Sequence, residues 1–370
     1  MACQSIQNEN SVNSITGEIK MYKIAVLGAG TWGIALAKLL AQNEHEVMVW
    51  SALPAEIEEL RKTGVHPKLP NVELPSCLQY TSNIDEACLY GEIIVMAVPS
   101  LYVRETTNKM LEYIKPNHII VDVAKGIEKK TLFTMTQVMR SELATKAGLE
   151  SVELVALSGP THAEEVIRNM PTTIVSACSN IEIAKIIQDV FSNEYMRVYT
   201  NPDALGVELC GALKNIIALA SGISHGLGYG DNTSATIITR GMAEITRLGL
   251  EMGCAEQTFY GLAGIGDLIV TATSLHSRNF KCGTLIGKGE DPDEAVKKIG
   301  MVVEGINVLP AAMELKEKYG VEMPISEGVA QIINEKADPR IIAQKLMVRD
   351  KKDEHGKNPL LVQFDEGFKG

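Results

Sequence analysis

Residues 23–33, KIAVLGAGTWG, decide the fold of this chain. They begin with a short, near-continuously apolar run, which is typical of a strand buried on both faces of a parallel sheet. Gly28, Gly30 and Gly33 follow in the spacing G-x-G-x-x-G, and a helical pattern starts at the last of them. The first glycine permits a tight turn, the second lets a pyrophosphate approach the backbone, and the third lets helix and strand pack closely. The anion would sit at the positive end of the helix; a purely structural glycine turn is the alternative.

Strand-like runs alternate with helical patterns through the first half of the chain. The expected strands are residues 23–27, 46–50, 93–98, 119–123, 154–157 and 173–177, and the expected helices include 33–43, 101–114 and 131–144. Alternation of this kind predicts βαβ units. The fold class is therefore α/β, with a doubly wound, mostly parallel Rossmann sheet.

The pattern changes after Thr200-Asn201-Pro202, and long helical patterns continue to about residue 345. A chain of 370 residues exceeds the usual size of one hydrophobic core, so two domains are expected. Asn-Pro is a turn signal and sets the boundary. We expect a loose N-terminal extension (1–20), a dinucleotide-binding Rossmann domain (21–201), an all-α catalytic domain (202–350) and a loose C-terminal tail (351–370).

Composition excludes several classes of function. The formal charge of −11, with no dense basic run, argues against a nucleic-acid partner. The seven cysteines show no C-x-x-C pair, which fits reduced thiols of a cytoplasmic protein and predicts no metal site. The first twenty residues lack an apolar signal core.

The run ALGVELCGALKNIIALASGI, residues 204–223, carries the charged residues Glu208 and Lys214. A charge in such a run is costly unless it is paired or chemically used. Six residues apart on a helix, the two side chains point in different directions and do not form an i,i+4 pair. Lys214 is thus either a catalytic acid or base, or a lysine that extends its charge out of a core helix. The two charges favour a buried helix over a membrane span.

Further polar residues follow apolar segments. Asp267 and Thr271 share one helix face in an apolar setting, and Lys214 is the natural partner of the aspartate. Arg278, in Ser277-Arg278-Asn279, could bind an anion bidentately or lie on the surface. Lys125 follows a strand, where it would lie at a cofactor cleft or be an ordinary solvated loop residue.

The second strand gives no clear sign of cofactor preference. An acid for NAD, or an arginine for NADP, is expected about twenty residues beyond the glycine motif. Residues 50–53 are instead Trp-Ser-Ala-Leu. Ser51 could accept either nucleotide, and the adenine could pack on Trp50 or Leu53. Pro99, after another strand, also falls where ligands bind such sheets.

Taken together, these segments resemble the NAD(P)-dependent glycerol-3-phosphate dehydrogenase family over residues 22–345. The segments that carry the resemblance are GAGTWG (28–33), VPS (98–100), AKGIE (124–128), SGPTHAEE (158–165), VELCGALKNIIALASG (207–222), GLAGIGDLIVTATS (261–274), SRN (277–279) and VVEG (302–305). Their ordered combination is far more specific than any one of them.

The resemblance implies a reversible hydride transfer between NAD or NADP and dihydroxyacetone phosphate, giving sn-glycerol 3-phosphate for phospholipid synthesis. It implies that Lys214 is the catalytic acid/base, with Lys125 and Asp267 completing the charge network. The substrate-binding positions would be Lys125, Gly159, Thr161, Lys214, Asn215, Asp267, Thr271, Ser277, Arg278 and Asn279. The turn motif and the resemblance together place the cofactor at Gly28, Gly30, Thr31, Trp32, Gly33, Ser51, Pro99, Lys125, Ala163, Arg278, Val302 and Glu304. A homodimer is expected.

Two departures from the family pattern are located. Ala52 and Leu53 stand where NADP-using bacterial relatives often carry arginine, which leaves the cofactor preference open. His162 stands where the family usually has an apolar aromatic residue, and we expect it to be structural. Two other hypotheses are a lysine-using Rossmann dehydrogenase of β-hydroxy acids and a catalytically silent nicotinamide sensor. A sensor without catalytic activity would have lost at least one of four charged residues, and all four are present: Lys125, Lys214, Asp267 and Arg278.

Overall fold

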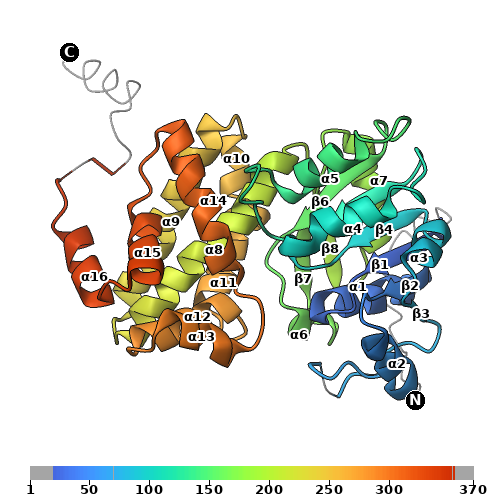
Figure 1. The fold of residues 1–370 in the computed structure, drawn as a ribbon, viewed down its shortest axis with the longest axis horizontal. Coiled ribbons are helices and arrows are strands. Elements are labelled where there is room, and N and C mark those ends of the chain that lie inside the picture. The colour runs from blue at the N-terminus through green and yellow to red at the C-terminus, as the bar shows by residue number, and fades with distance from the viewer. Residues whose placement is uncertain (1–19, 70, 352, 355–370) are drawn as a thin grey trace, which may run out of the picture.

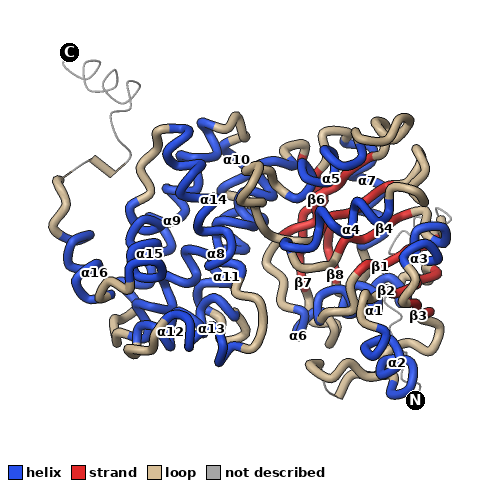
Figure 2. Tube along the Cα trace, viewed as in Figure 1, coloured by secondary structure: helices blue, strands red, loops and turns tan. Residues whose placement is uncertain are grey.

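The computed structural model describes residues 20–69, 71–351 and 353–354. The extension and the tail expected at 1–20 and 351–370 therefore lie almost entirely outside the described residues. Figure 1 shows two layers of different kinds side by side: a sheet with its covering helices on the right, and an assembly of helices on the left. Figure 2 separates them by secondary structure, with every strand in the right-hand half.

One sheet of eight strands runs in the order β3-β2-β1-β4-β5-β6-β7-β8. The strands are β1 (Lys23–Leu27), β2 (Glu46–Trp50), β3 (Gln79–Thr81), β4 (Ile93–Met96), β5 (Ile119–Asp122), β6 (Glu153–Ser158), β7 (Thr172–Ala177) and β8 (Met196–Asn201). All neighbours pair in parallel except β6 and β7, which are antiparallel. The sheet is therefore doubly wound and mostly parallel, as predicted.

Helices cover both faces of the sheet because successive strand residues point to opposite sides. Ile24 and Val26 of β1 face one apolar core, whereas Ala25 and Leu27 face another. The helices of this half are α1 (Thr31–Gln42), α2 (Pro54–Thr63), α3 (Ile84–Tyr90), α4 (Val103–Met110), α5 (Met135–Leu143), α6 (Ala163–Val166) and α7 (Ile181–Phe191). Side chains of α1 and α7 pack in the first core, and those of α3, α4 and α5 pack in the second.

The structure corrects several element assignments. Strands β3 and β8 were not predicted, and the helix expected over 101–114 is a 3₁₀ turn (Ser100–Tyr102) followed by α4, which ends at Met110. The helix expected over 131–144 begins later, because Thr134 forms a capping box with Gln137 at the start of α5.

The second half is helical among the described residues. Its elements are α8 (Ala204–Gly226), α9 (Asp231–Glu251), α10 (Glu256–Phe259), a π-helical turn (Leu262–Gly266), α11 (Asp267–Thr273), α12 (Arg278–Gly287), α13 (Pro292–Ile299), α14 (Glu304–Tyr319), α15 (Pro324–Glu335) and α16 (Pro339–Met347). Helix α8 lies at the centre and contributes residues from Leu209 to Ile223 to the helical core.

Helix α8 is long and apolar enough to cross a membrane, but 83% of its most apolar window is buried by the rest of the protein. The bent pair formed by residues 256–273 and 278–287 also passes that test of length and composition. Core helices of globular proteins show the same composition. Burial agrees with the expectation that residues 204–223 form an internal helix.

Candidate active site

The glycine-rich turn between β1 and α1 has the geometry that a pyrophosphate requires. Gly28 has φ +129°, and a side chain there would also meet the Ala97 carbonyl. A β-carbon at Gly33 would lie 2.0 Å from the Gly28 carbonyl oxygen, so helix and turn touch directly. At Gly30, by contrast, nothing lies within 4 Å of a built β-carbon. Gly30 caps α1 without a side-chain hydrogen bond, so the helix start is open to an anion and fits a dinucleotide.

The carboxyl ends of β4 and β5 meet the start of α14 beside this turn. Ser100 donates from its hydroxyl to a Glu304 oxygen at 2.8 Å, and its backbone N–H lies 3.4 Å from the other oxygen. Gly126 packs so closely on Ser100 that a β-carbon would approach the serine's own to 2.5 Å. Glu304 therefore ties the helical half to the loops next to Pro99 and Lys125, which the sequence assigned to the cofactor.

One buried carboxylate joins the two lysines. Asp267 has no solvent exposure; Lys214 approaches one of its oxygens at 2.5 Å and Lys125 the other at 2.7 Å. Lys214 also donates to the Thr271 hydroxyl at 2.5 Å, and Lys125 donates to the Gly159 carbonyl at 3.2 Å. The predicted catalytic residues are thus brought together from the loop after β5, from α8 and from α11.

The contacts of Lys214 leave one donor unused among the described residues. A lysine ammonium has three N–H donors, and Asp267 and Thr271 accept two of them. Burial, opposed by the Asp267 carboxylate and reinforced by the Lys125 ammonium, lowers the pKa of Lys214 to about 7. Near neutral pH this side chain can both hold and release a proton.

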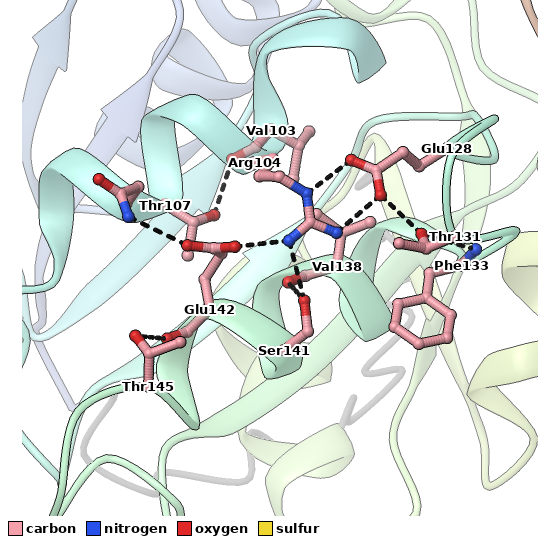
Figure 3. A network of polar contacts seen from close by, with 11 residues as sticks. Val103, Arg104, Thr107, Glu128, Thr131, Phe133, Val138, Ser141, Glu142 and Thr145 are labelled. Atoms are coloured by element: carbon pink, nitrogen blue, oxygen red, sulfur yellow. Dashed lines mark hydrogen bonds and ion pairs between the residues drawn. The ribbon is translucent and has the colours of Figure 1, made fainter.

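A cluster centred on Arg104 fixes the loop that carries Lys125 (Figure 3). Arg104, on α4, binds both carboxylate oxygens of Glu128 at 2.6 Å, in the bidentate geometry typical of arginine. It also donates to Glu142 at 2.5 Å and to Ser141, both on α5. Glu128 ends the AKGIE segment. The segment was recognised from the sequence, but the role of Glu128 was not, because Arg104 lies in an unrelated helical stretch.

The hydrogen bonds of Glu208 explain how the apolar run 204–223 accommodates a second charged residue. It lies on α8 and accepts from the Thr134 hydroxyl at 2.9 Å and from the backbone N–H and hydroxyl of Thr136 at the start of α5. Burial raises its pKa, and these donors oppose the shift. Burial and the nearby Glu208 also raise the pKa of Asp122, at the end of β5, well above its usual range. Glu208 therefore connects the helical half to the sheet half and forms no hydrogen bond or ion pair with Lys214.

The segment expected to bind substrate surrounds the start of α12. Asn279 donates to the Asn215 side chain at 2.8 Å and accepts from the Gly305 N–H at 2.9 Å. Arg278 is exposed and donates through one nitrogen to the Val302 carbonyl at 3.0 Å. Ser277 accepts from Phe280 N–H and so caps the helix. These contacts bring five predicted substrate and cofactor positions into one corner.

The turn after β6 carries three further residues that were predicted to line the substrate or the cofactor. Gly159 contacts Lys125, Thr161 donates to the Gly159 carbonyl at 3.2 Å, and Ala163 begins α6. The His162 ring lies 5.6 Å from that of His276, and its Nε2 is buried without a hydrogen-bond partner. Burial and the nearby Lys214 ammonium lower the pKa of His162, which favours the neutral ring.

The structure at the end of β2 excludes one of the two side chains on which the adenine was expected to pack. Trp50 is only 5% exposed and donates its indole N–H to the Ser82 carbonyl at 3.1 Å, so its ring faces the core. Leu53 is 58% exposed and stays available. Ser51 donates to Glu56, an acid on α2 that does not directly follow the strand and was not predicted from the sequence. Trp32 packs against the first core, and Thr31 begins α1.

Within the described residues no cluster of three or more histidine, cysteine or acidic side chains could hold a metal ion.

Comparisons with known proteins place both halves. Residues 23–184 match the family model described as NAD-dependent glycerol-3-phosphate dehydrogenase N-terminus, and residues 203–344 match the C-terminus. A protein of Lactobacillus delbrueckii subsp. bulgaricus named glycerol-3-phosphate dehydrogenase [NAD(P)+] 2 is 58% identical over 91% of this chain and 100% of that protein. A protein of Agathobacter rectalis named glycerol-3-phosphate dehydrogenase [NAD(P)+] is 49% identical over 90% of this chain and 98% of that protein. The crystal structure of glycerol-3-phosphate dehydrogenase from Coxiella burnetii has a TM-score of 0.84, with 36% identity over 89% of this chain and 99% of that one.

Proposed function

This chain belongs to the NAD-dependent glycerol-3-phosphate dehydrogenase family, and from that premise we propose how its residues carry out the reaction. The protein is an NAD(P)-dependent oxidoreductase that reduces dihydroxyacetone phosphate reversibly to sn-glycerol 3-phosphate. When bound, the reduced nicotinamide supplies a hydride to the carbonyl carbon. The protein must then bind the phosphate, orient the carbonyl and give a proton to its oxygen.

Lys214 is the proton donor. The carbonyl oxygen gains negative charge as its carbon is reduced, and it needs a donor within hydrogen-bond reach. The unused N–H of Lys214 supplies that proton, while Asp267 and Thr271 hold the other two. In the reverse direction the neutral amine accepts the proton of the substrate hydroxyl. The single observation that carries this proposal is the buried Asp267 carboxylate shared by Lys214 and Lys125.

Lys125 and Arg278 supply positive charge for the rest of the substrate. Lys125 is part-buried beside Asp267 and stabilises the developing charge at the oxygen. Arg278 binds the phosphate through the guanidinium donors that Val302 does not use. Asn215, Asn279, Thr271 and the turn of Gly159 and Thr161 fix the orientation of the glycerol backbone.

The test measures oxidation of NADH and of NADPH separately, with dihydroxyacetone phosphate and with a panel of β-keto acids. Turnover with the triose phosphate and not with the keto acids supports the proposal. Turnover with the keto acids alone would favour the β-hydroxyacid alternative and contradict it. Binding of nucleotide without turnover of any substrate would indicate the sensor instead.

We further propose that residues 21–201 form the nucleotide-binding domain and 202–350 the catalytic domain, since β8 ends at Asn201 and α8 begins at Ala204. The protein would act in the cytoplasm and supply glycerophospholipid synthesis, because its product is the backbone of those lipids.

We also propose a homodimer that pairs through α16. Met347 is 82% exposed on this helix and lines a cavity of about 770 Å³, whose other lining residues on α8, α9, α15 and α16 include apolar side chains and several arginines. Light scattering of the full chain at micromolar concentration should give twice the monomer mass, and Met347→Asp should give the monomer. A wild-type monomer would contradict this proposal.

A further inference from the structure

The carboxylate of Glu56 lies beside the end of β2 and has no role in the reaction as proposed above. Ser51 is buried and donates its hydroxyl hydrogen to Glu56 at 2.7 Å. The same Ser51 oxygen accepts from the Leu53 N–H at 3.1 Å, which fixes the hydroxyl so that it points at the glutamate. Glu56 lies in the first turn of α2 and is itself exposed. Its carboxylate is therefore anchored at one oxygen and open to solvent.

This carboxylate lies beside the glycine-rich turn. Leu27 and Trp50 are register partners, and the Gly28 N–H donates to the Trp50 carbonyl at 2.9 Å, so the residue after Trp50 borders the turn. In βαβ nucleotide sites the adenosine ribose lies at this edge, between the turn and the end of the second strand. Ser51 and Glu56 therefore lie where the adenosine ribose would bind and not where the nicotinamide would.

His66 closes the same region from the loop that follows α2. The Lys68 N–H donates to His66 Nδ1 at 3.1 Å, so the neutral ring carries its proton on Nε2. The ring is 7% exposed, and the Ala29 carbonyl of the turn and the charge of Glu56 both act on it. The loop, the turn and Glu56 therefore lie close together.

The charges at this edge favour a ribose hydroxyl over a phosphate. Ala52 and Leu53 directly follow the strand and carry no charge, and Arg61 on α2 is turned to the Tyr80 carbonyl at 2.7 Å. Lys68, in the same loop as His66, is the positive charge that would have to bind a 2′-phosphate. An anchored carboxylate can accept a hydrogen bond from the 2′-hydroxyl, whereas it repels a 2′-phosphate.

We propose that Glu56, held by Ser51, binds the ribose 2′-hydroxyl of the cofactor and makes the enzyme prefer NADH to NADPH. The inference rests on the proposed function for its cofactor, but it concerns affinity at the adenosine end. It can therefore be measured without the reaction.

Calorimetry with ADP-ribose and with 2′-phospho-ADP-ribose tests the preference on the full chain. The wild type should bind ADP-ribose at least about tenfold more tightly, since like charges in contact cost about 1.4 kcal/mol or more. Glu56→Gln should lower that ratio about tenfold, chiefly by tighter binding of the phosphorylated compound. Ser51→Ala should shift the ratio in the same direction but less. Glu58→Gln, an exposed charge on the same helix, is the matched control and should leave the ratio unchanged.

Two outcomes would overturn the inference: a wild type that prefers the 2′-phosphate, with the preference lost in Lys68→Ala, or an unchanged ratio in folded Glu56→Gln. Circular dichroism verifies folding, and Glu56→Ala, at the same exposed position, serves if the glutamine variant does not fold. The ratio of kcat/KM for NADH and NADPH should follow the binding ratio. Absence of turnover with dihydroxyacetone phosphate, together with the expected binding ratio, would contradict the proposed function and leave this inference standing.

Discussion

Lys214 and Asp267 face each other at 2.5 Å across the interface of α8 and α11, and both are buried. The carboxylate keeps the lysine charged, while its surroundings make that charge costly. The opposing effects leave a proton that is bound only moderately tightly, as a catalyst of proton transfer requires.

Replacing Lys214 by alanine should abolish turnover. Loss of the proton donor lowers kcat by about 10²–10⁴-fold, the usual contribution of general acid catalysis. Lys125 still neutralises Asp267, so the variant should fold and bind NADH normally, as measured by nucleotide fluorescence. Lys185→Ala, on the exposed face of α7, is the control. A Lys214→Ala enzyme with near-normal kcat would show that the acid is another group.

The pH dependence of the reaction should change sign with its direction. Reduction needs Lys214 protonated, so its rate should fall as pH rises through about 7, the pKa of that lysine. Oxidation of glycerol 3-phosphate needs the neutral amine, so its rate should rise over the same interval. Saturating kinetics in both directions from pH 5.5 to about 9 would measure this, and parallel profiles would contradict the assignment.

Arg278→Ala should mainly raise the KM for dihydroxyacetone phosphate, by about ten- to a hundredfold, because hydrogen bonds to a charged group contribute about 1.5–3 kcal/mol. Dihydroxyacetone, which lacks the phosphate, should be an equally poor substrate of variant and wild type. Arg197→Ala, at an exposed position of β8, is the control. A similar loss with both substrates would instead indicate a general disruption of the site.

Two glycines of the same turn should behave differently. Gly33→Ala should destabilise the protein by about 1–3 kcal/mol, because its β-carbon would overlap the Gly28 carbonyl. Gly30→Ala has free space and an ordinary φ of −68°, so its thermal midpoint should equal that of the wild type. It should nevertheless bind nucleotide at least tenfold more weakly, since the methyl group occupies the place of the pyrophosphate. Normal nucleotide binding by Gly30→Ala would place the phosphates elsewhere.

Arg104→Met should lower kcat several-fold, because the Lys125 loop loses its attachment through Glu128 (Figure 3). The arginine is one-third exposed, so the loss of stability should be only about 1 kcal/mol. Arg104→Lys keeps the charge without the planar fork and should restore activity only in part. Lys109→Met, an exposed ion pair on the same helix, is the control. Unchanged kcat in Arg104→Met would mean that the loop is fixed without it.

The sequence predicted best those elements whose residues are buried on both faces. Strand β1 was placed to the residue because its residues after Lys23 are all buried, on both faces of the sheet. Strand β8 was missed because its residues alternate between buried and exposed at the edge of the sheet, and β3 because it has three residues. The reversal of β7 depends on where its connection runs, and no periodic pattern records that.

The sequence predicted those parts of the candidate site in which a charged residue stands in an apolar helix, where its burial costs free energy unless it is paired. Lys214 and Asp267 could be paired because neither is tolerated alone in an apolar helix. The partners of Glu208 could not be found in this way, because threonines at the start of α5 have an ordinary local role as helix caps. Glu56 was missed because its position depends on how α2 folds back over the end of β2.

The shared carboxylate also constrains how this enzyme can evolve. Loss of Asp267 alone would leave two lysines facing each other without a counter-charge, and loss of both lysines would leave a buried anion unpaired. Loss of Asp267 alone, or of both lysines together, therefore meets a penalty in folding as well as in catalysis. A descendant with a different proton donor must change several of them together, so these positions should diverge as a group.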